Sequence, residues 1–464
     1  MKFRGGYNIF LEGRPLREVC LLPEPDMFYL ALRSARFTFS EICVKDGTRV
    51  RSGELLAYDP NNHKVPLLAP RKGDVQLDTV KGHIILSDIS PAEAEADVSA
   101  EGPMHISGGK GTAVTNAQKL LDLGAWQFFS DAYSGLLPDP RVVPQAVLVS
   151  TLSLEPFLAR GDVQLHHHLL DFTRGLEHIQ SLLEYQPIYL VMPHIRSSLA
   201  SKVKEQIRGY AWVRIIEIPL KYPYDNFSIL ARRLGLGRSD GPVWSVRTEG
   251  VLAVDRALTY SRPCLDRMVS IGGPMARSAV HVRVTAGYPV KRIVDMYAEG
   301  GEVRVLDGGI LTGRSLDFQE QGLDTECTGL TFLGEHEKRE FLGFMRPGWD
   351  RRSYSWCFLS GFRKDFPERL DTAMRGELRA CIACGFCEKV CPAGIMPHLI
   401  HKYLYRSLIE EAEEARADLC IRCGLCSFVC PSKIELRQQI ADAQDLIGRE
   451  KAELGGVNVR KDSA

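Results

Sequence analysis

The stretch Cys381-Ile-Ala-Cys384-Gly-Phe-Cys387-Glu-Lys-Val-Cys391-Pro392 is repeated in the same rhythm as Cys420-Ile-Arg-Cys423-Gly-Leu-Cys426-Ser-Phe-Val-Cys430-Pro431. The two copies hold eight of the thirteen cysteines in the chain. Three thiolates in one short loop can cap one face of an iron–sulfur cubane, and a more distant Cys-Pro supplies the fourth thiolate. The spacing therefore predicts two [4Fe-4S] clusters near the C-terminal end of the sequence.

The repeat also suggests which cysteines share a cluster. Where two such clusters lie in one domain, the fourth cysteine of each motif ligates the cluster of the other motif. We therefore assign two sets of ligands: cluster one to Cys381, Cys384, Cys387 and Cys430, and cluster two to Cys420, Cys423, Cys426 and Cys391. The alternative is a pair of structural Cys₄ zinc sites. Since a zinc site does not need the repeated Cys-Pro, the pattern favours iron and sulfide.

The residues between the cysteines carry further expectations. Gly385 and Gly424 occupy the same slot in each loop, which indicates a positive φ or a close backbone approach. Apolar residues beside the cysteines are expected to limit water access to the clusters; they are Ile382, Phe386, Val390, Ile421, Leu425, Phe428 and Val429. Lys389, Arg422 and Lys433 flank the loops and could steer an acidic partner, although simple exposure to solvent also explains them.

The composition narrows the class of protein. A chain of 464 residues is too long for one hydrophobic core, and its formal net charge of zero gives no support to a nucleic-acid or anionic-membrane role. No stretch approaches the roughly 20 apolar residues that span a bilayer. Residues 1–10 lack the features of a secretory signal, so we expect a reducing, cytoplasmic setting. The remaining cysteines are expected to be buried free thiols; they stand at positions 20, 43, 264, 327 and 357.

The first fifth of the chain consists of short runs of β-type residues. Residues 10–90 contain a Gly-x-x-Val-x-x-Gly-x-x-Leu run from Gly47 and an Ala-Pro-x-x-Gly turn from Ala69. Both phrases predict strands joined by tight turns, and they resemble the flattened β-sandwich of biotinyl and lipoyl carriers. Lys72 lies in that turn, as the modified lysine of a carrier does. Its flanking residues lack the carrier consensus, so an ordinary exposed lysine is expected.

The later parts of the sequence predict three further structural types. Strands at 146–150, 188–192 and 215–218 alternate with helices at 171–184 and 198–210, which is typical of an α/β domain with a parallel sheet. Residues 262–330 return to short strands. From Pro367 onward the pattern is helical, with an amphipathic helix expected at 398–417 and a charged helix at 436–454.

We therefore expect a multidomain α+β fold. Its predicted parts are an N-terminal flattened β-sandwich of biotinyl/lipoyl type (1–104), a central α/β Rossmann-like domain (105–260), a small SLBB-like β-grasp domain (261–335), a connector (336–370) and an α-helical ferredoxin domain with two [4Fe-4S] clusters (371–464).

Two weaker motifs invite functional readings. The glycine-rich run from Ser107 to Thr112 evokes a phosphate-binding loop, but it fits neither the Walker spacing nor the dinucleotide fingerprint, so a flexible connector is expected. Three consecutive histidines, His166 to His168, could suggest a metal. Consecutive side chains diverge on a helix and alternate on a strand, so a half-buried strand or a surface run is expected instead.

Two family resemblances accompany these observations. Residues 377–439 resemble the C-terminal ferredoxin domain of the C subunit of Rnf complexes (RnfC), the membrane-bound ferredoxin:NAD oxidoreductases. Phrases elsewhere are similar to NqrA, the first-named subunit of the sodium-translocating NADH:quinone oxidoreductases: Leu120 to Trp126, Val149 to Phe157, Val243-Trp-Ser, Phe341 to Gly348, Phe358-Leu-Ser and Gly376 to Arg379. In NqrA the ferredoxin-like segment survives without its cysteines, whereas this chain has all eight.

The resemblances imply an electron-transfer subunit of a membrane-associated Nqr/Rnf-type oxidoreductase. Its partners would be the other subunits of such a complex, with ferredoxin or quinone as further candidates, and its place would be the inner face of the cell membrane. Rnf C subunits hold flavin mononucleotide (FMN) and NADH on a glycine-rich run ending Gly-Ala-Gly-Phe-Pro, and this chain has only Gly108-Gly-Lys-Gly-Thr-Ala there. We therefore expect the chain to bind neither FMN nor NADH tightly, and we assign no catalytic residue.

Two alternatives stay open. One is a catalytic subunit that itself binds NADH and FMN, and the other is a soluble iron–sulfur adaptor of a cytoplasmic dehydrogenase. The sequence does not decide whether the chain alone is an enzyme, which ion is coupled to its electron transfer, or in which direction electrons flow.

Overall fold

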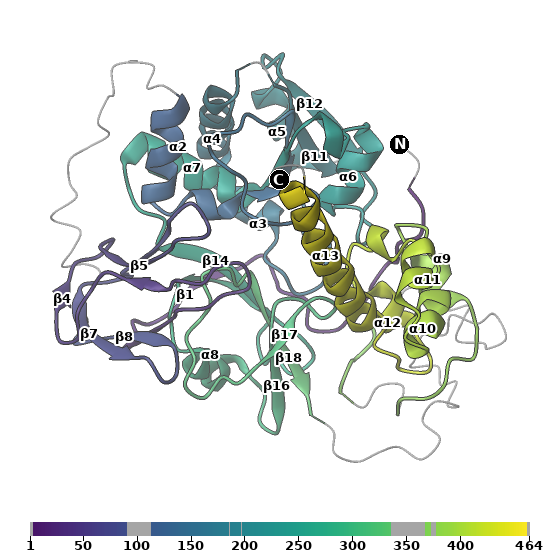
Figure 1. The fold of residues 1–464 in the computed structure, drawn as a ribbon. Helices are drawn as coiled ribbons and strands as arrows, with labels where there is room; N and C mark the ends of the chain where they lie inside the picture. Colours follow the sequence, from purple (N-terminus) through teal and green to yellow (C-terminus); the bar gives the residue numbers. More distant parts are fainter. Residues whose placement is uncertain are drawn as a thin grey trace.

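The computed structural model describes residues 3–90, 113–184, 186–195, 197–335, 367–372 and 377–461 (Figure 1). Several predicted features lie outside these ranges and are not described. They are the glycine-rich run at 107–112, the phrases Phe341 to Gly348 and Phe358-Leu-Ser, Cys357, and most of the predicted connector.

Two small antiparallel sheets form the first part of the chain. One has the order β2-β8-β7-β4 and the other the order β3-β5-β6. Their bounds are β2 Phe28–Ala31, β3 Glu41–Ile42, β4 Arg49–Val50, β5 Leu55–Asp59, β6 Val65–Leu68, β7 Gly73–Asp78 and β8 His83–Ser87. Alternate residues of β2, Phe28 and Leu30, are buried, as the pleat of a strand with one apolar face requires. Lys72 is exposed in the bend before β7.

One strand leaves this region. β1 (Val19–Leu21) pairs in parallel with β15 (Val280–Thr285), and so adds an edge strand to a six-stranded sheet of order β1-β15-β14-β18-β16-β17. The other members are β14 Asp266–Gly272, β16 Val303–Asp307, β17 Arg314–Leu316 and β18 Gly329–Gly334, with helix α8 (Val290–Tyr297) between β15 and β16. Residues far apart in the sequence thus complete one sheet, which local patterns could not foretell.

The α/β part has a five-stranded sheet of order β12-β11-β10-β13-β9. Its strands are β9 Ser130–Asp131, β10 Ala146–Ser150, β11 Ile188–Pro193, β12 Val213–Ile218 and β13 Val243–Arg247. The four long strands are parallel, and β9 runs antiparallel to β13. All five residues of β10 are buried, as expected for a central parallel strand covered on both faces.

Helices enclose this sheet. Their bounds are α2 Ala113–Asp122, α3 Gly161–Leu165, α4 Leu169–Leu182, α5 Ser198–Gln206, α6 Phe227–Leu234 and α7 Thr248–Tyr260, with 3₁₀ turns at Trp126–Phe128 and Arg238–Asp240. Val147 and Val149 of β10 pack into the core that also holds residues of α2, α4, α5 and α7, whereas Ala146 and Leu148 share a core with α6. The predicted alternation of strands and helices is confirmed, with boundaries shifted by a few residues.

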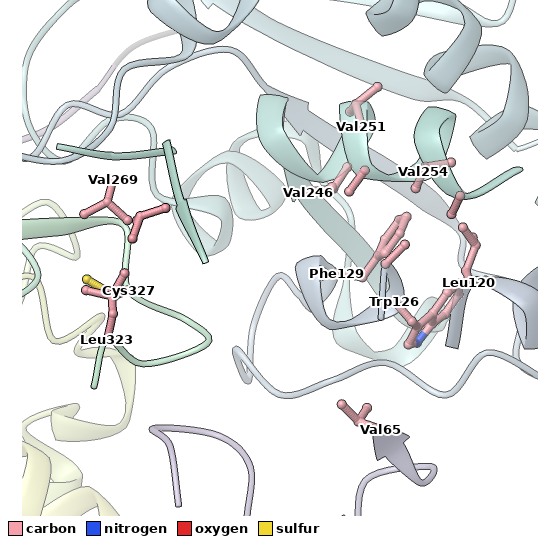
Figure 2. Packing of buried hydrophobic residues seen from close by; sticks show 14 of the residues in the cluster. Val65, Leu120, Trp126, Phe129, Val246, Val251, Val254, Val269, Leu323 and Cys327 are labelled. Atoms are coloured by element: carbon pink, nitrogen blue, oxygen red, sulfur yellow. The ribbon is translucent and has the colours of Figure 1, made fainter. Parts of the chain in front are cut away.

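A cluster of three large aromatic side chains, Trp126, Phe129 and Trp244, lies between the α/β part and the N-terminal sheets. Trp126 stacks on Phe129 with ring centroids 4.8 Å apart and meets Trp244 edge-on at 5.1 Å. Its indole N–H donates a hydrogen bond to the Pro138 carbonyl oxygen at 3.0 Å. Figure 2 shows Trp126 and Phe129 beneath α7, with Val65 of β6 facing them. Burial of such large side chains stabilises the contact between the two parts.

The last part is helical and lies beside the six-stranded sheet (Figure 1). It consists of α9 Phe386–Val390, α10 Pro397–Tyr405, α11 Ile409–Glu414, α12 Leu425–Val429 and α13 Leu436–Lys461. The prediction of one helix over 398–417 is wrong. Ser407 has a φ of 57° and Arg416 a φ of 66°, and these left-handed residues end α10 and α11 respectively. The closing helix is longer than the predicted 436–454.

The isolated thiols have mixed environments. Cys327 is buried with its sulfur inside the core (Figure 2), and Cys20 and Cys264 are partly buried. Cys43, however, is exposed just after the short strand β3, so the prediction of a buried thiol is wrong at that position.

Candidate metal centre

The two cysteine motifs fold alike. In each, a glycine in the left-handed region begins a one-turn helix: Gly385, with a φ of 73°, precedes α9, and Gly424, with a φ of 78°, precedes α12. The fourth cysteine of each motif follows the helix directly, where its backbone turns extended. The prediction that these two glycines need positive φ is confirmed. Helices α9 and α12 contact each other, which brings the two motifs face to face.

The eight thiols line two small cavities. Cys381, Cys384, Cys387 and Cys430 line the first, together with His398. The second is lined by Cys391, Cys420, Cys423 and Cys426. In each cavity three cysteines come from one motif and the fourth from the other. No group of His, Cys, Asp or Glu in the described ranges is arranged to hold a single metal ion.

The donor set suits an iron–sulfur core. Each cavity offers four soft thiolate donors, which is the ligand type that Fe–S clusters take. Burial raises the pKa of the Cys387 thiol to about 11 and that of Cys426 to about 12. A coordinating thiol is nevertheless deprotonated, so loading either site with metal must release protons.

Backbone amides are aimed at several of these sulfurs. The amide of Arg422 donates to the Cys420 sulfur at 3.4 Å. Burial raises the pKa of Cys391, and the amides of Ala393, Gly394 and Ile395 oppose that rise by hydrogen bonding to its sulfur. Such N–H···S bonds stabilise negative charge on sulfur and are one of the ways in which a protein sets the potential of a cluster.

The apolar surroundings differ between the motifs. Val390, Leu425 and Val429 are buried, as predicted. Ile382 lines the first cavity but is 68% exposed, so it shields that cavity from water only in part. Its counterpart in the second motif, Ile421, is partly buried. The two loops therefore have the same backbone but face different environments.

The cysteine-bearing part docks on the rest of the chain. The Tyr222 hydroxyl donates to the Cys423 carbonyl oxygen at 2.7 Å, and the Gly6 amide donates to the Val390 carbonyl oxygen at 2.8 Å. A shared core lies beneath these bonds; it contains Ile9, Leu11, Phe157, Tyr222, Leu311, Leu333, Leu370, Val390, Leu425 and Val429. The second motif is thus built into the junction with the α/β part and the six-stranded sheet.

Two of the three basic residues beside the loops serve internal contacts. The Arg422 guanidinium donates to Gln444 at 2.7 Å and pairs with Asp445 at 2.5 Å, both on α13. The Lys433 ammonium donates to the Thr372 carbonyl oxygen at 2.9 Å. Lys389 is exposed, with its ammonium 5.8 Å from the ring centre of Phe386. That a basic residue steers an acidic partner stays a prediction, and Lys389 is the candidate among these three.

A cavity of about 540 Å³ lies next to this junction. The segments after β10, β11 and β12 line it, which is where open α/β sheets bind ligands. Its wall is largely apolar, with Arg14, Arg17 and Arg160 among the polar residues. Tyr222 belongs both to this wall and to the contact with Cys423. The cavity was not predicted from the sequence, although a strand ending at Ser150 was a usable signal.

Glu155 is a buried carboxylate in the cavity wall. One of its oxygens accepts hydrogen bonds from the amides of Leu311 at 2.9 Å and Thr312 at 2.7 Å, and the other accepts from the Thr312 hydroxyl at 2.6 Å. Burial raises the pKa of Glu155, and these three donors oppose the rise. The carboxylate thereby fixes the loop that packs against the second cysteine motif.

The histidine run forms no site. His166 and His167 are exposed in the turn between α3 and α4, with Nδ1 of the first 3.0 Å from Nε2 of the second. The His168 ring bonds to Asp171 at 2.9 Å. The surface run that the sequence predicts is confirmed, and the alternative of a half-buried strand is wrong because the segment connects two helices.

Comparison with known proteins gives two matches to family models. Residues 380–435 match a 4Fe-4S dicluster domain, and residues 112–261 match the second alpha/beta domain of NqrA. The chain is thus similar to NqrA and, in its cysteine-bearing part, to a 4Fe-4S dicluster domain. The similarity to NqrA extends over most of its length.

Individual NqrA proteins are similar to this chain. NqrA of Actinobacillus pleuropneumoniae serotype 5b, from a Na(+)-translocating NADH-quinone reductase, is 24% identical over 395 residues, which cover 85% of this chain and 84% of that protein. NqrA of Alcanivorax borkumensis is 26% identical over 359 residues, 76% of this chain and 78% of that protein. Among solved structures, an NAD⁺-reducing [NiFe]-hydrogenase in the H₂-reduced state aligns with a TM-score of 0.42, 12% identity, 81% coverage of this chain and 75% of its own.

In the part of the chain that the structure describes, every helix is too short or too polar to cross a membrane.

Proposed function

We propose that this protein is an electron-transfer subunit of a membrane-associated Nqr-type oxidoreductase. It would hold two [4Fe-4S] clusters and relay single electrons between a soluble carrier, on the NADH or ferredoxin side, and a membrane module that contains quinone or flavin. The proposal includes the predicted domain boundaries at residues 104, 260, 335 and 370 and a position on the inner face of the cell membrane.

The observation that carries the proposal is the lining of the two small cavities. Each has four cysteine residues, and each takes its fourth from the opposite motif. This distribution agrees with the ligand sets proposed for cluster one and cluster two. A cluster held in this way supplies reversible one-electron transfer, while the protein provides amides, burial and docking surfaces that set its potential.

The similarity to NqrA supports the membrane complex. NqrA is named for a Na(+)-translocating NADH-quinone reductase, and the alignment covers 85% of this chain. We infer that partner subunits supply the membrane-spanning part. Coupling to ion transport would then belong to the whole complex rather than to this chain.

One observation favours a second function. The cavity of about 540 Å³ is large enough for a small cofactor, and Tyr222 connects its wall to Cys423. A catalytic subunit that binds FMN or NADH there would pass electrons directly to the neighbouring cluster. We place this alternative second because the chain has lost most of the glycine-rich run that holds FMN in the Rnf C subunits it resembles.

Metal analysis of anaerobically purified protein tests the proposed function. The expected content is about eight iron and eight acid-labile sulfide per chain, which corresponds to two cubanes. Stoichiometric zinc without iron would refute the proposal. Fractionation of cells that express the partner subunits tests the second part, because the chain is then expected in the membrane fraction.

A further inference from the structure

The repeated motif provides an internal comparison between two equivalent loops. Gly385 and Gly424 have the same backbone conformation. Among the residues that the structure describes, a Cβ atom added at Gly385 would meet no other atom within 4 Å, whereas one added at Gly424 would lie 2.5 Å from the Leu311 carbonyl oxygen. The first loop therefore has an open side at the position where the second loop is covered by the chain itself.

Other positions of the repeat show the same asymmetry. Ile382 is 68% exposed and Cys384 is exposed in the first loop. In the second loop Cys423 is partly buried, its carbonyl oxygen accepts the Tyr222 hydroxyl, and Leu425 has no exposed surface. The loop at 381–387 thus has exposed residues where its counterpart at 420–426 lies against an internal junction.

From this asymmetry we infer that the two clusters have unequal roles. Cluster one, held by the first loop, is the end at which the chain exchanges electrons with a separate redox protein. Cluster two is the inner end, beside the cavity of the α/β part. The inference rests on the proposed function, and it adds the order of the two centres and the surface that the partner meets.

The surface around cluster one indicates the kind of partner. Two exposed apolar residues belong to the segment that lines its cavity or adjoin it: Leu378 is 69% exposed and Ile382 is 68% exposed. The exposed charges of α9, Glu388 and Lys389, have opposite signs. Since this apolar collar carries no dominant charge, it fits a redox protein whose own centre is surrounded by a neutral, apolar face.

The exchange needs no other reactant. One electron leaves the partner's centre and enters cluster one, or takes the reverse path, and no bond is formed or broken. Apolar contact brings the two centres close, and the absence of a dominant charge predicts a weak dependence of the rate on ionic strength.

The order of the centres is tested on holoprotein whose iron and sulfide content has been measured first. A water-soluble paramagnetic complex such as dysprosium–EDTA is added, and the spin relaxation of each reduced cluster is followed by EPR. Signals are assigned with Cys384→Ser for cluster one and Cys420→Ser for cluster two. The cluster-one signal is expected to relax at least several times more strongly. Equal enhancement, or a larger effect on cluster two, would overturn the inference, whereas protein without iron would instead refute the proposed function.

The apolar collar is tested by electron transfer with a small two-cluster ferredoxin, followed by stopped flow. Ile382→Glu places a charge in the collar and is expected to slow the transfer about tenfold, the size of a significant interface residue. Leu21→Glu, at an 81% exposed position of β1, is the matched control and should leave the rate unchanged. Reduction by methyl viologen, which needs no protein contact, should be equally fast in all three proteins. An unchanged ferredoxin rate in Ile382→Glu would overturn the proposed collar.

Discussion

The Tyr222 hydroxyl donates a hydrogen bond to the backbone carbonyl oxygen of Cys423 over 2.7 Å. Tyr222 lies between β12 and α6 of the α/β part, and Cys423 lies in the second cysteine loop. One side chain therefore joins two parts of the chain that are 201 residues apart in sequence. Burial raises the pKa of this phenol well above its usual value, which keeps it protonated and able to donate.

Tyr222→Phe removes the hydroxyl and keeps the ring. The Cys423 carbonyl then loses its donor, and we expect a loss of about 1–2 kcal/mol in the free energy of unfolding, together with a shift in the potential of cluster two. Denaturant unfolding and a redox titration measure the two effects. Tyr133→Phe is the control, since it removes a bond to the Leu236 carbonyl oxygen at a site outside the junction. A potential shift of the same size in the control would contradict the assignment.

Gly424→Ala and Gly385→Ala form a matched pair. Both introduce a side chain at positive φ, which costs about 1–2 kcal/mol. Only the first also forces a Cβ to within 2.5 Å of the Leu311 carbonyl oxygen, so we expect Gly424→Ala to lose more stability and to retain less iron. Thermal unfolding and metal content report the difference. Equal losses of stability and iron in the two variants would mean that the space around Gly385 and the space around Gly424 are equally restricted.

The crossed ligand sets predict opposite effects for two equivalent substitutions. Cys430→Ser should perturb the cluster held by Cys381, Cys384 and Cys387, and Cys391→Ser should perturb the other one. EPR of the reduced variants distinguishes the clusters. If each substitution altered the cluster of its own motif instead, the pairing would be wrong.

A partly buried ion pair between Arg36, near the N-terminal sheets, and Glu326, near the six-stranded sheet, predicts a pH dependence of stability. Burial raises the pKa of Glu326, but the Arg36 charge and hydrogen bonds from Arg36 and Ser34 lower it overall to below 4.5. A carboxyl with a depressed pKa stabilises the fold fully above its unfolded value, and this stability is lost as the pH falls through the folded value. Unfolding of the wild type should therefore become easier below about pH 4.5.

Glu326→Gln isolates this contribution. The variant should be less stable than the wild type at pH 7, and the gap between the two should narrow as the pH falls from 4.5. Arg36 also donates to the Phe129 carbonyl oxygen, so its replacement would remove more than the ion pair and is the poorer test. A gap that is constant from pH 7 to pH 3 would show that the pair is not responsible.

The glycines between Ser107 and Thr112 do not match the longer glycine-rich run of the Rnf C subunits, which predicts weak flavin binding. A flavin phosphate needs several backbone amides, commonly from closely spaced glycines at a helix start. We therefore expect isolated protein to bind neither FMN nor NADH tightly in a fluorescence or calorimetric titration. Stoichiometric FMN binding that is abolished by Gly109→Val or Gly111→Val would promote the second candidate function over the first.

The sequence predicted the elements whose pattern is local. Strands β10, β11 and β12 appear as apolar runs, and the glycines before α9 and α12 occupy repeated slots, so local chemistry was enough to place them. The break of the 398–417 helix was missed because an amphipathic pattern continues through Ser407, whose left-handed backbone no residue type there requires.

Local sequence patterns could not predict which distant segments of the chain contact each other. Nothing in Val19–Leu21 indicates a partner strand near residue 280, and nothing in Ile382 distinguishes it from Ile421. Whether a loop residue is exposed depends on which surface of the chain packs over it, and here Leu311 and Tyr222 cover only one of two equivalent loops. The candidate cavity was missed for the same reason, since its wall is assembled from segments distant in sequence.

The contact of residues 5–11 with the cysteine-bearing part has a consequence for biosynthesis. Gly6 donates to the Val390 carbonyl oxygen, and Leu11 forms a bridge with Glu368. Because a ribosome makes the chain from its N-terminal end, these two contacts must wait for residues synthesised 357 and 384 positions later, whereas Tyr7 can pair with Tyr222 much earlier. At the usual 5–20 residues per second the longer delay lasts roughly 20–80 seconds. The N-terminal segment can therefore settle against the α/β part first, and its remaining contacts form only after the last quarter of the chain has been made.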